Sequence, residues 1–273
     1  MARLTEFVAG FLTQPGCLTV KGAGLAPMRF PVRAWLIETA AGPLLWDSGY
    51  SESLVQATQD SIYRWYPLIT CVSYDPAQGV AQQLRRHGLP PREIRTLVVS
   101  HFHADHYAGM RDFPDAALVC SREAWSHVRR LRGVAALASA FVPALLPADV
   151  ATRLTFVEHF PERPLSAALA PFTQGWDLSG TGEVLAVPLP GHARGHLGAF
   201  VITDAGWVLL ATDAAMSKRS IEDPIVHGPP VLSALVHHNH RAHRATLDRL
   251  AALHAAGHVA IRLTHEESPG AAT

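Results

Sequence analysis

The segment "LIETAAGPLLWD" at residues 36–47 has the pattern of a β-hairpin. Two apolar runs flank an Ala-Ala-Gly turn, and Gly42 supplies a backbone conformation that residues with a Cβ resist. The segment "VITDAGWVLLATD" at residues 201–213 repeats this pattern around Gly206. A strand, a glycine turn and a second strand therefore occur twice, which predicts a chain built from two related halves.

Each hairpin ends in an aspartate. Asp47 stands five residues after Gly42, and Asp213 stands seven residues after Gly206. Since side chains along a strand alternate between its two faces, a difference of two residues predicts that both aspartates project from equivalent faces.

Helical and strand patterns alternate over the rest of the chain. The predicted elements are a helix over 76–87, a strand over 94–100, a helix over 121–132, strands near 152–158, 183–188 and 198–203, a helix near 240–256 and a last strand over 258–264. Strands and helices that interleave in this way predict an α/β fold in which helix layers cover sheets.

The composition is that of a globular protein with no long-range electric field. The chain has 273 residues, of which 48% are hydrophobic, enough for one sizeable domain or two small ones. Lys plus Arg and Asp plus Glu are equal at 23 each, so the net charge does not attract nucleic acid or an anionic membrane. We expect a neutral small-molecule substrate instead.

The three cysteines, Cys17, Cys71 and Cys120, are widely spaced and form no CxxC pair. They predict neither a disulfide framework nor a thiolate zinc site. The N-terminus lacks the pattern of a cleaved signal, and no window approaches the ~20 apolar residues that a spanning helix needs. We therefore expect a mature cytoplasmic protein that does not enter a membrane.

Two apolar stretches interrupted by prolines, near 51–75 and 133–149, fit no long regular element. We interpret them as insertions that lie over a cleft or join the subunits of a homodimer. Ordinary packing in the core explains them equally well.

The segment "SHFHADH" at 100–106 carries the densest group of possible metal ligands. In an extended backbone His101 and His103 point the same way and can reach one ion. Asp105 and His106 follow after the chain has begun to turn, so they can serve a second ion. Imidazole and carboxylate are ligands of zinc, and they also suit iron, manganese or cobalt. The segment predicts two metal ions, either two Zn(II) ions or iron, manganese or cobalt at one or both sites.

Three later residues also end apolar strands. His192 follows "VPLPG", Asp213 follows "LLAT", and His265 follows "IRLT". Because α/β folds collect functional groups at one rim of a sheet, we expect these side chains to join the first group.

Together these motifs resemble the metallo-β-lactamase superfamily. "HFHADH" is similar to its HxHxDH signature, and "PGHARGH", Asp213 and His265 are similar to its later motifs, over about residues 30 to 267. The resemblance implies an αββα sandwich of two pseudo-symmetric halves, formed as a single domain over 1–273. It also implies the ligands: His101, His103 and His192 for one metal, Asp105, His106 and His265 for the other, and Asp213 as the bridge.

The resemblance implies further roles for residues near the ligands. Asp105 is expected to relay a proton, Asp47 to brace the ligand loops, and His196 to buttress the loop after His192. The residues expected to line a substrate pocket are Trp65, Phe102, Tyr107 and Met216. The cluster His237, His238, His240 and His243 is expected to form a solvated face or the edge of a cleft.

The implied activity is metal-dependent hydrolysis of a lactone or ester, closest in pattern to quorum-signal lactonases that open acyl-homoserine lactones. A glyoxalase II-like thioesterase and a mononuclear Fe(II) persulfide dioxygenase are the alternatives; the latter would use only His101 or His103 with His192 and Asp213. Many such lactonases have a tyrosine where this chain has Met216. Tyr107 or another group would then have to supply the missing hydrogen-bond donor.

Overall fold

The computed structural model describes residues 1–19, 21–59, 61–223, 225–226 and 238–266, and these form two six-stranded sheets. The first sheet contains, in spatial order, β1 (Arg3–Pro15), β2 (Pro27–Thr39), β3 (Gly42–Trp46), β4 (Thr96–Val98), β5 (Ala117–Cys120) and β6 (Leu154–Phe156). The second contains β12 (Val259–Leu263), β11 (Gly206–Thr212), β10 (Leu197–Thr203), β9 (Val184–Pro188), β8 (Gln174–Asp177) and β7 (Glu162–Pro164).

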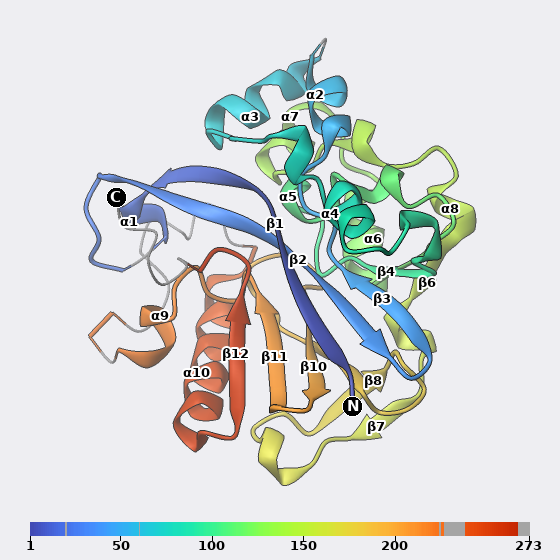
Figure 1. The fold of residues 1–273 in the computed structure, drawn as a ribbon. Coiled ribbons are helices and arrows are strands. Elements are labelled where there is room, and N and C mark those ends of the chain that lie inside the picture. Colours follow the sequence, from blue (N-terminus) through green and yellow to red (C-terminus); the bar gives the residue numbers. More distant parts are fainter. Residues whose placement is uncertain (20, 60, 224, 227–237, 267–273) are drawn as a thin grey trace.

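The helices are mostly short and fall into two groups on opposite sides of the sheets (Figure 1). Along the first sheet lie α2 (Glu52–Thr58), η1 (Ile62–Arg64), α3 (Trp65–Ile69), η2 (Pro76–Gln78), α4 (Val80–Arg86), η3 (Pro91–Glu93), α5 (Ala104–Tyr107), η4 (Met110–Asp112), α6 (Arg122–Val128), α7 (Gly133–Ala138), η5 (Pro143–Leu145) and α8 (Val150–Arg153). The remaining helices are α1 (Gly16–Thr19), η6 (Val157–His159), η7 (Ala167–Leu169), α9 (Arg219–Glu222) and α10 (His240–Ala256).

Strand periodicity sorts the apolar side chains into three layers. In β2, Trp35 and Ile37 face the second sheet, whereas Ala34 and Leu36 face the first group of helices. The other strands alternate in the same way: in β11, Leu210 joins the layer between the sheets and its neighbours join the layer under α10. Both sheets are therefore covered on two faces, which gives the αββα sandwich that the resemblance implied.

The predicted pseudo-symmetry is present in the strand pairing. β2 and β3 form an antiparallel hairpin, and β3 then pairs in parallel with β4. β10 and β11 form the second hairpin, and β11 pairs in parallel with β12. Gly42 and Gly206 have φ values of 117° and 106°, so the turns use the left-handed backbone that was predicted for these glycines.

Most predicted elements occur, with different bounds. The helix predicted over 76–87 is divided into η2 and α4 because Gly79, with ψ of 138°, leaves the helical region. Asp75 caps its start by accepting from the backbone N–H of Ala77, and Gly88 follows its end. Across the part of the chain that the structure describes, no helix is long and apolar enough to span a membrane.

The layer between the sheets should contribute strongly to the stability of the fold. Leu210 is fully buried there, so Leu210→Ala should lower the free energy of unfolding by about 2–5 kcal/mol through lost transfer energy and a cavity. Leu25, which is 81% exposed, provides the control, since Leu25→Ala should change it by less than about 0.5 kcal/mol. Chemical denaturation of both variants measures the difference, and equal midpoints would contradict the assignment of this layer as core.

Candidate metal centre

The seven predicted ligands lie together at one edge of the two sheets. His101 and His103 follow β4, and Asp105 and His106 lie in the single turn of α5. The other three follow later strands: His192 after β9, Asp213 after β11 and His265 after β12. Their side chains form two groups of possible metal ligands, each with its ligand atoms within 4.8 Å of one another.

The first group consists of His101, His103, His192 and Asp213. His192 Nε2 is 3.0 Å from His103 Nδ1 and 3.4 Å from Asp213 Oδ2. His101 Nε2 is 3.8 Å from the same Oδ2 atom. Three imidazoles and one carboxylate oxygen thus converge on one point.

The second group consists of Asp105, His106, Asp213 and His265. His265 Nε2 lies 3.2 Å from both Asp105 Oδ2 and Asp213 Oδ2. His106 Nε2 lies 3.4 Å from Asp105 Oδ2 and 3.3 Å from Asp213 Oδ2. The Oδ2 atom of Asp213 therefore belongs to both groups.

These distances fit atoms that share a metal ion. Two ligand atoms about 2.1 Å from a tetrahedral ion are about 3.4 Å apart, which is close to most of the separations above. His101 Nε2 and His106 Nε2 are also buried and have no hydrogen-bond partner among the described residues. Buried polar atoms without partners are costly, and a metal ion would satisfy both. The cluster can therefore hold two metal ions.

The ionisation of His101 and Asp213 suits this role. Burial and neighbouring imidazoles hold the pKa of His101 well below its usual value, which keeps a lone pair available for a metal. Burial raises the pKa of Asp213, but His265 and His106 outweigh that effect and hold the pKa well below its usual value. The Asp213 carboxylate, which belongs to both groups, is therefore ionised.

Hydrogen bonds behind the ligands fix their orientation. The Asp47 carboxylate accepts from His106 Nδ1, Ser100 N and Ser100 Oγ, each at 2.8 Å. His265 Nδ1 donates to the Pro31 carbonyl at 2.9 Å, which turns its Nε2 toward Asp213. Such bonds select the tautomer and direction of a ligating imidazole.

The two hairpin aspartates do not behave as strand alternation alone predicts. Asp47 itself has φ of 60°, whereas in the second hairpin Thr212, the residue before Asp213, has φ of 46°. The pairing of β11 with β12 also shifts between Leu210 and Thr212. Because the backbone twists at different residues, Asp213 reaches into the cluster and Asp47 stays behind it.

His196 lies where the resemblance placed it, behind the ligands. Its Nε2 is 2.6 Å from Thr212 Oγ1, and burial lowers its pKa to about 3, so the ring is neutral. It therefore ties the loop after β9 to the end of β11, next to Asp213.

The later histidine cluster needs one correction. His238 and His240 are exposed, as expected, and His237 lies outside the described residues. The expectation of a solvated face is wrong for His243, which is 3% exposed and donates from Nε2 to the Ala214 carbonyl at 2.9 Å. It occupies an inward position of α10, and burial lowers its pKa to about 4. This neutral imidazole holds the chain just after Asp213.

A cavity of about 470 Å³ opens onto the ligands. Its wall includes the ligands His103, Asp105, His192, Asp213 and His265. Most of the remaining lining is apolar and includes Leu12, Leu18, Ile69, Val134, Leu137 and Met216. The arrangement places a possible metal pair at the floor of an apolar chamber.

Of the four residues expected in a substrate pocket, Met216 lines this cavity and the other three do not. Trp65 is half-exposed, and its neighbour Tyr66 faces inward in its place. Phe102 and Tyr107 are buried in the helix-side core, and the Tyr107 hydroxyl bonds both backbone groups of Val142. Tyr107 therefore has no free hydroxyl for a substrate, and the expectation for these three residues was wrong.

The two apolar stretches meet over the cavity. Tyr66, Ile69 and Thr70 come from the first, and Val134 and Leu137 from the second. Other residues of the second stretch, namely Phe141, Val142 and Leu145, pack in the core. The two apolar stretches therefore both cover the cavity and contribute residues to the core.

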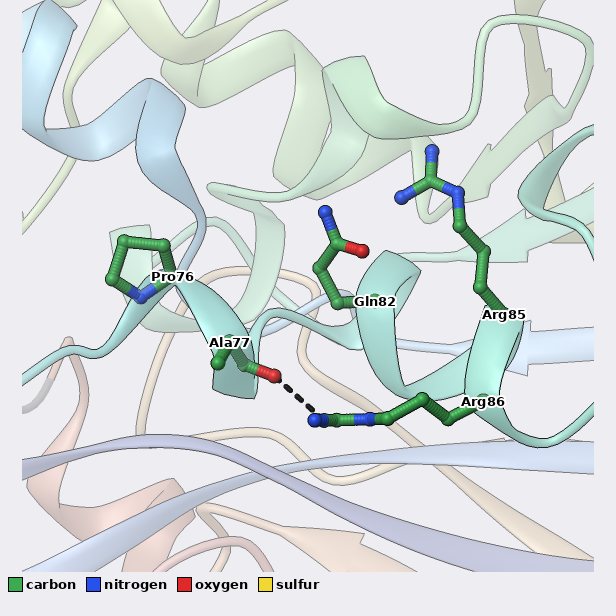
Figure 2. A pocket seen from close by; sticks show the side chains of 5 residues that line it. All are labelled: Pro76, Ala77, Gln82, Arg85 and Arg86. Atoms are coloured by element: carbon green, nitrogen blue, oxygen red, sulfur yellow. Dashed lines mark hydrogen bonds between the residues drawn. The ribbon is translucent and has the colours of Figure 1, made fainter.

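A second depression, of about 430 Å³, lies away from the ligands between η2 and α4 (Figure 2). It is lined by Pro76, Ala77, Gln82, Arg85 and Arg86, and Arg86 donates to the Ala77 carbonyl at 2.6 Å. No described residue in its lining is a carboxylate or an imidazole, so it lacks the chemistry of the first cavity.

The fold and the cluster together define an αββα sandwich whose strand ends can bind two metal ions. The chain belongs to the metallo-β-lactamase superfamily, because its residues 27–256 match the family described as "Metallo-beta-lactamase superfamily". The family and the fold predicted from the sequence motifs are thereby confirmed.

Several relatives carry functional names. A probable metallo-hydrolase of Mycobacterium tuberculosis is 29% identical over 212 residues, which cover 76% of this chain and 63% of the relative. The chain thus spans less than two thirds of that relative's length. An N-acyl homoserine lactonase of Bacillus thuringiensis is 25% identical over 201 residues, which cover 72% of this chain and 69% of the lactonase.

Solved structures share the fold at low sequence identity. An N-acyl homoserine lactone hydrolase, with the product N-hexanoyl-L-homoserine bound at its catalytic metal center, has a TM-score of 0.72 and 18% identity over 96% of this chain and 92% of that one. A probable metal-dependent hydrolase from Staphylococcus aureus has a TM-score of 0.73 and 14% identity over 97% and 90% of the two chains.

The loop that carries His192 depends on Gly191. This glycine has φ of 128°, and a Cβ there would overlap the backbone of His243 in α10. We therefore expect Gly191→Ala to displace His192 and to weaken binding of metal by about 10-fold or more, as measured by titration with zinc. Gly206→Ala is the matched control, because Gly206 has φ of 106° but nothing within 4 Å of an added Cβ. Equal zinc affinities in the two variants would contradict this role.

Proposed function

We propose that this protein is a dinuclear zinc hydrolase that cleaves a lactone or ester with an apolar acyl group. The proposal rests on the position of Asp213 Oδ2. This atom lies within 3.8 Å of the Nε2 atoms of four histidines, His101, His106, His192 and His265. In this proposal His101, His103 and His192 would hold one ion, Asp105, His106 and His265 would hold the other, and Asp213 would contribute a ligand to both. A pair of zinc ions lowers the pKa of water and polarises a carbonyl oxygen.

Side chains of this protein would transfer the proton during hydrolysis and hold the ligands in place. Asp105 lies at the floor of the cavity, and its Oδ1 atom faces the chamber side near Tyr66. It can take a proton from the attacking water and pass it to the oxygen that leaves. Asp47, His196 and His243 hold the ligand loops, so the reacting groups need little reorganisation.

The cavity favours an acyl substrate over a charged one. Leucine, isoleucine, valine, methionine and alanine side chains form most of its wall above the ligands. The net charge of zero likewise favours a neutral substrate. Relatives named as N-acyl homoserine lactonases support a lactone as the first substrate to test.

The complete second group of ligands favours hydrolysis over the alternative with one iron ion. A mononuclear Fe(II) dioxygenase needs only two histidines and one carboxylate. It would leave without a function the two histidines beside Asp105 Oδ2, which are His106 with Nε2 at 3.4 Å and His265 with Nε2 at 3.2 Å. A thioesterase uses the same two-metal chemistry, and a comparison of substrates separates it from a lactonase.

Metal analysis tests the proposal directly. Each purified chain should contain two zinc ions, one for each group of ligands, and removing them with a chelator should abolish hydrolysis of lactones and esters. Asp213→Ala should lose metal and reduce kcat/KM by more than about 100-fold, because it removes a ligand from both groups. Asp204→Ala, at an exposed hairpin turn, is the control and should keep both ions. One iron per chain with consumption of oxygen would sink the proposal.

The apolar wall predicts a dependence on acyl length. Each added methylene of an ester should raise kcat/KM by up to about fourfold until the cavity is filled, since burial of a CH₂ gives about 0.8 kcal/mol. Leu137→Asp should flatten this dependence, because Leu137 lines the cavity. Leu68→Asp is the control: Leu68 lies in the neighbouring α3 and is 64% exposed. The same slope in the wild type and Leu137→Asp would show that the acyl chain lies elsewhere.

A further inference from the structure

Tyr66 is a polar side chain in the apolar part of the cavity wall. It lies in α3, is 3% exposed and lines the cavity over the ligands. Its hydroxyl donates to Asp105 Oδ1 at 3.5 Å. It therefore brings a phenol O–H to the edge of the possible metal pair from a segment that holds no ligand.

This hydrogen bond is easily redirected. A separation of 3.5 Å is long for an O–H donor, for which 2.7–2.8 Å is usual, so Asp105 holds the phenol weakly. Behind Tyr66 the fully buried hydroxyl of Tyr50 lies 3.4 Å away and can donate to the Tyr66 oxygen. When Tyr50 is the donor, the Tyr66 hydrogen is left to point toward Asp105 Oδ1 at the cavity.

The other hydroxyl and amide side chains of the described cavity wall each donate to a backbone carbonyl. Thr19 Oγ1 donates to Gly16 at 3.0 Å, and Thr70 Oγ1 donates to Tyr66 at 2.7 Å. Gln14 Nε2 donates to Ile69 at 3.3 Å. Met216 has a thioether, which has no hydrogen to donate. Among these side chains, Tyr66 is the one whose hydrogen points toward the reacting groups.

We propose that Tyr66 donates a hydrogen bond to the oxygen that leaves when the substrate is hydrolysed, an inference that rests on the proposed function. Attack by water breaks the bond between the acyl carbon and this oxygen, which keeps the electron pair. The oxygen then receives the proton that Asp105 took from water, and the phenol keeps its own proton throughout. While Asp105 carries that proton it accepts hydrogen bonds poorly, so the Tyr66 hydrogen is free to turn to the substrate.

The leaving group provides the decisive test. In zinc-loaded full-length protein, Tyr66→Phe should lower kcat/KM for γ-octalactone, whose alkoxide leaves reluctantly, by about 100-fold. The same variant should lower kcat/KM for 4-nitrophenyl octanoate by less than about threefold, since nitrophenolate needs little stabilisation. A merely structural role for Tyr66 would reduce both rates by the same factor.

Tyr63→Phe is the matched control. Tyr63 lies in the adjacent η1, and its hydroxyl accepts from the backbone N–H of Gly133, joining the same two apolar stretches. Removal of this hydroxyl disturbs the same cover over the cavity but no donor in its wall. The ratio of the two rates should therefore stay at its wild-type value in this variant.

Binding gives a readout that does not depend on turnover. Octylphosphonate has a tetrahedral anionic head that resembles the adduct of an attacked acyl group, and calorimetry can measure its affinity at equal zinc content. Tyr66→Phe should weaken this affinity by about 10-fold, because a hydrogen bond to a charged group is lost. Tyr63→Phe should leave it unchanged.

The outcomes separate this inference from the proposed function. The role of Tyr66 would be overturned if Tyr66→Phe left the octylphosphonate affinity unchanged and lowered kcat/KM for both esters equally or not at all. Hydrolysis by the wild type would still stand in that case. A wild type that hydrolyses neither ester overturns the proposed function and the step assigned to Tyr66 with it. Weaker octylphosphonate binding together with a loss confined to the lactone supports the role.

Discussion

The arrangement of the possible metal ligands depends on the position of one carboxylate oxygen, Asp213 Oδ2. Asp213 Oδ2 lies 3.2–3.8 Å from Nε2 atoms of four histidines that come from three separate segments of the chain. A buried anion among imidazoles is tolerable because each neighbour offers a positive or metal-binding group. The chain after β11 must therefore be held accurately, and Thr212, His196 and His243 all contribute to that placement.

The three apolar layers make such accuracy possible. β4, β9, β11 and β12 are anchored in the layers above and below the sheets, so their ends lie at fixed positions relative to one another. Polar side chains just beyond those ends meet without crossing the core. The same architecture leaves the opposite wall of the cavity to short helices from two apolar stretches, and these supply no ligand.

Much of this could be predicted because the signals are local. Alternation within strands, glycine turns and the dense segment at 100–106 are each contained in a few residues, and they led to the correct family and fold. The hairpin aspartates show the limit of this reasoning. Both were recognised, but their different directions result from a left-handed residue at Asp47 in one copy and at Thr212 in the other, which periodicity does not reveal.

The sequence by itself determined that helix layers cover sheets in two related halves, and which residues could bind metal, because strand period and motif spacing are encoded over short distances. The αββα sandwich followed from the resemblance of these motifs to the family. Only the tertiary structure decided which side chains face the cavity. Trp65 and Tyr66 are adjacent in α3, yet packing of that single short helix exposes the first and buries the second beside Asp105. His243 likewise lies among exposed histidines in sequence, and contact with Ala214 buries it. These orientations depend on contacts between segments tens of residues apart.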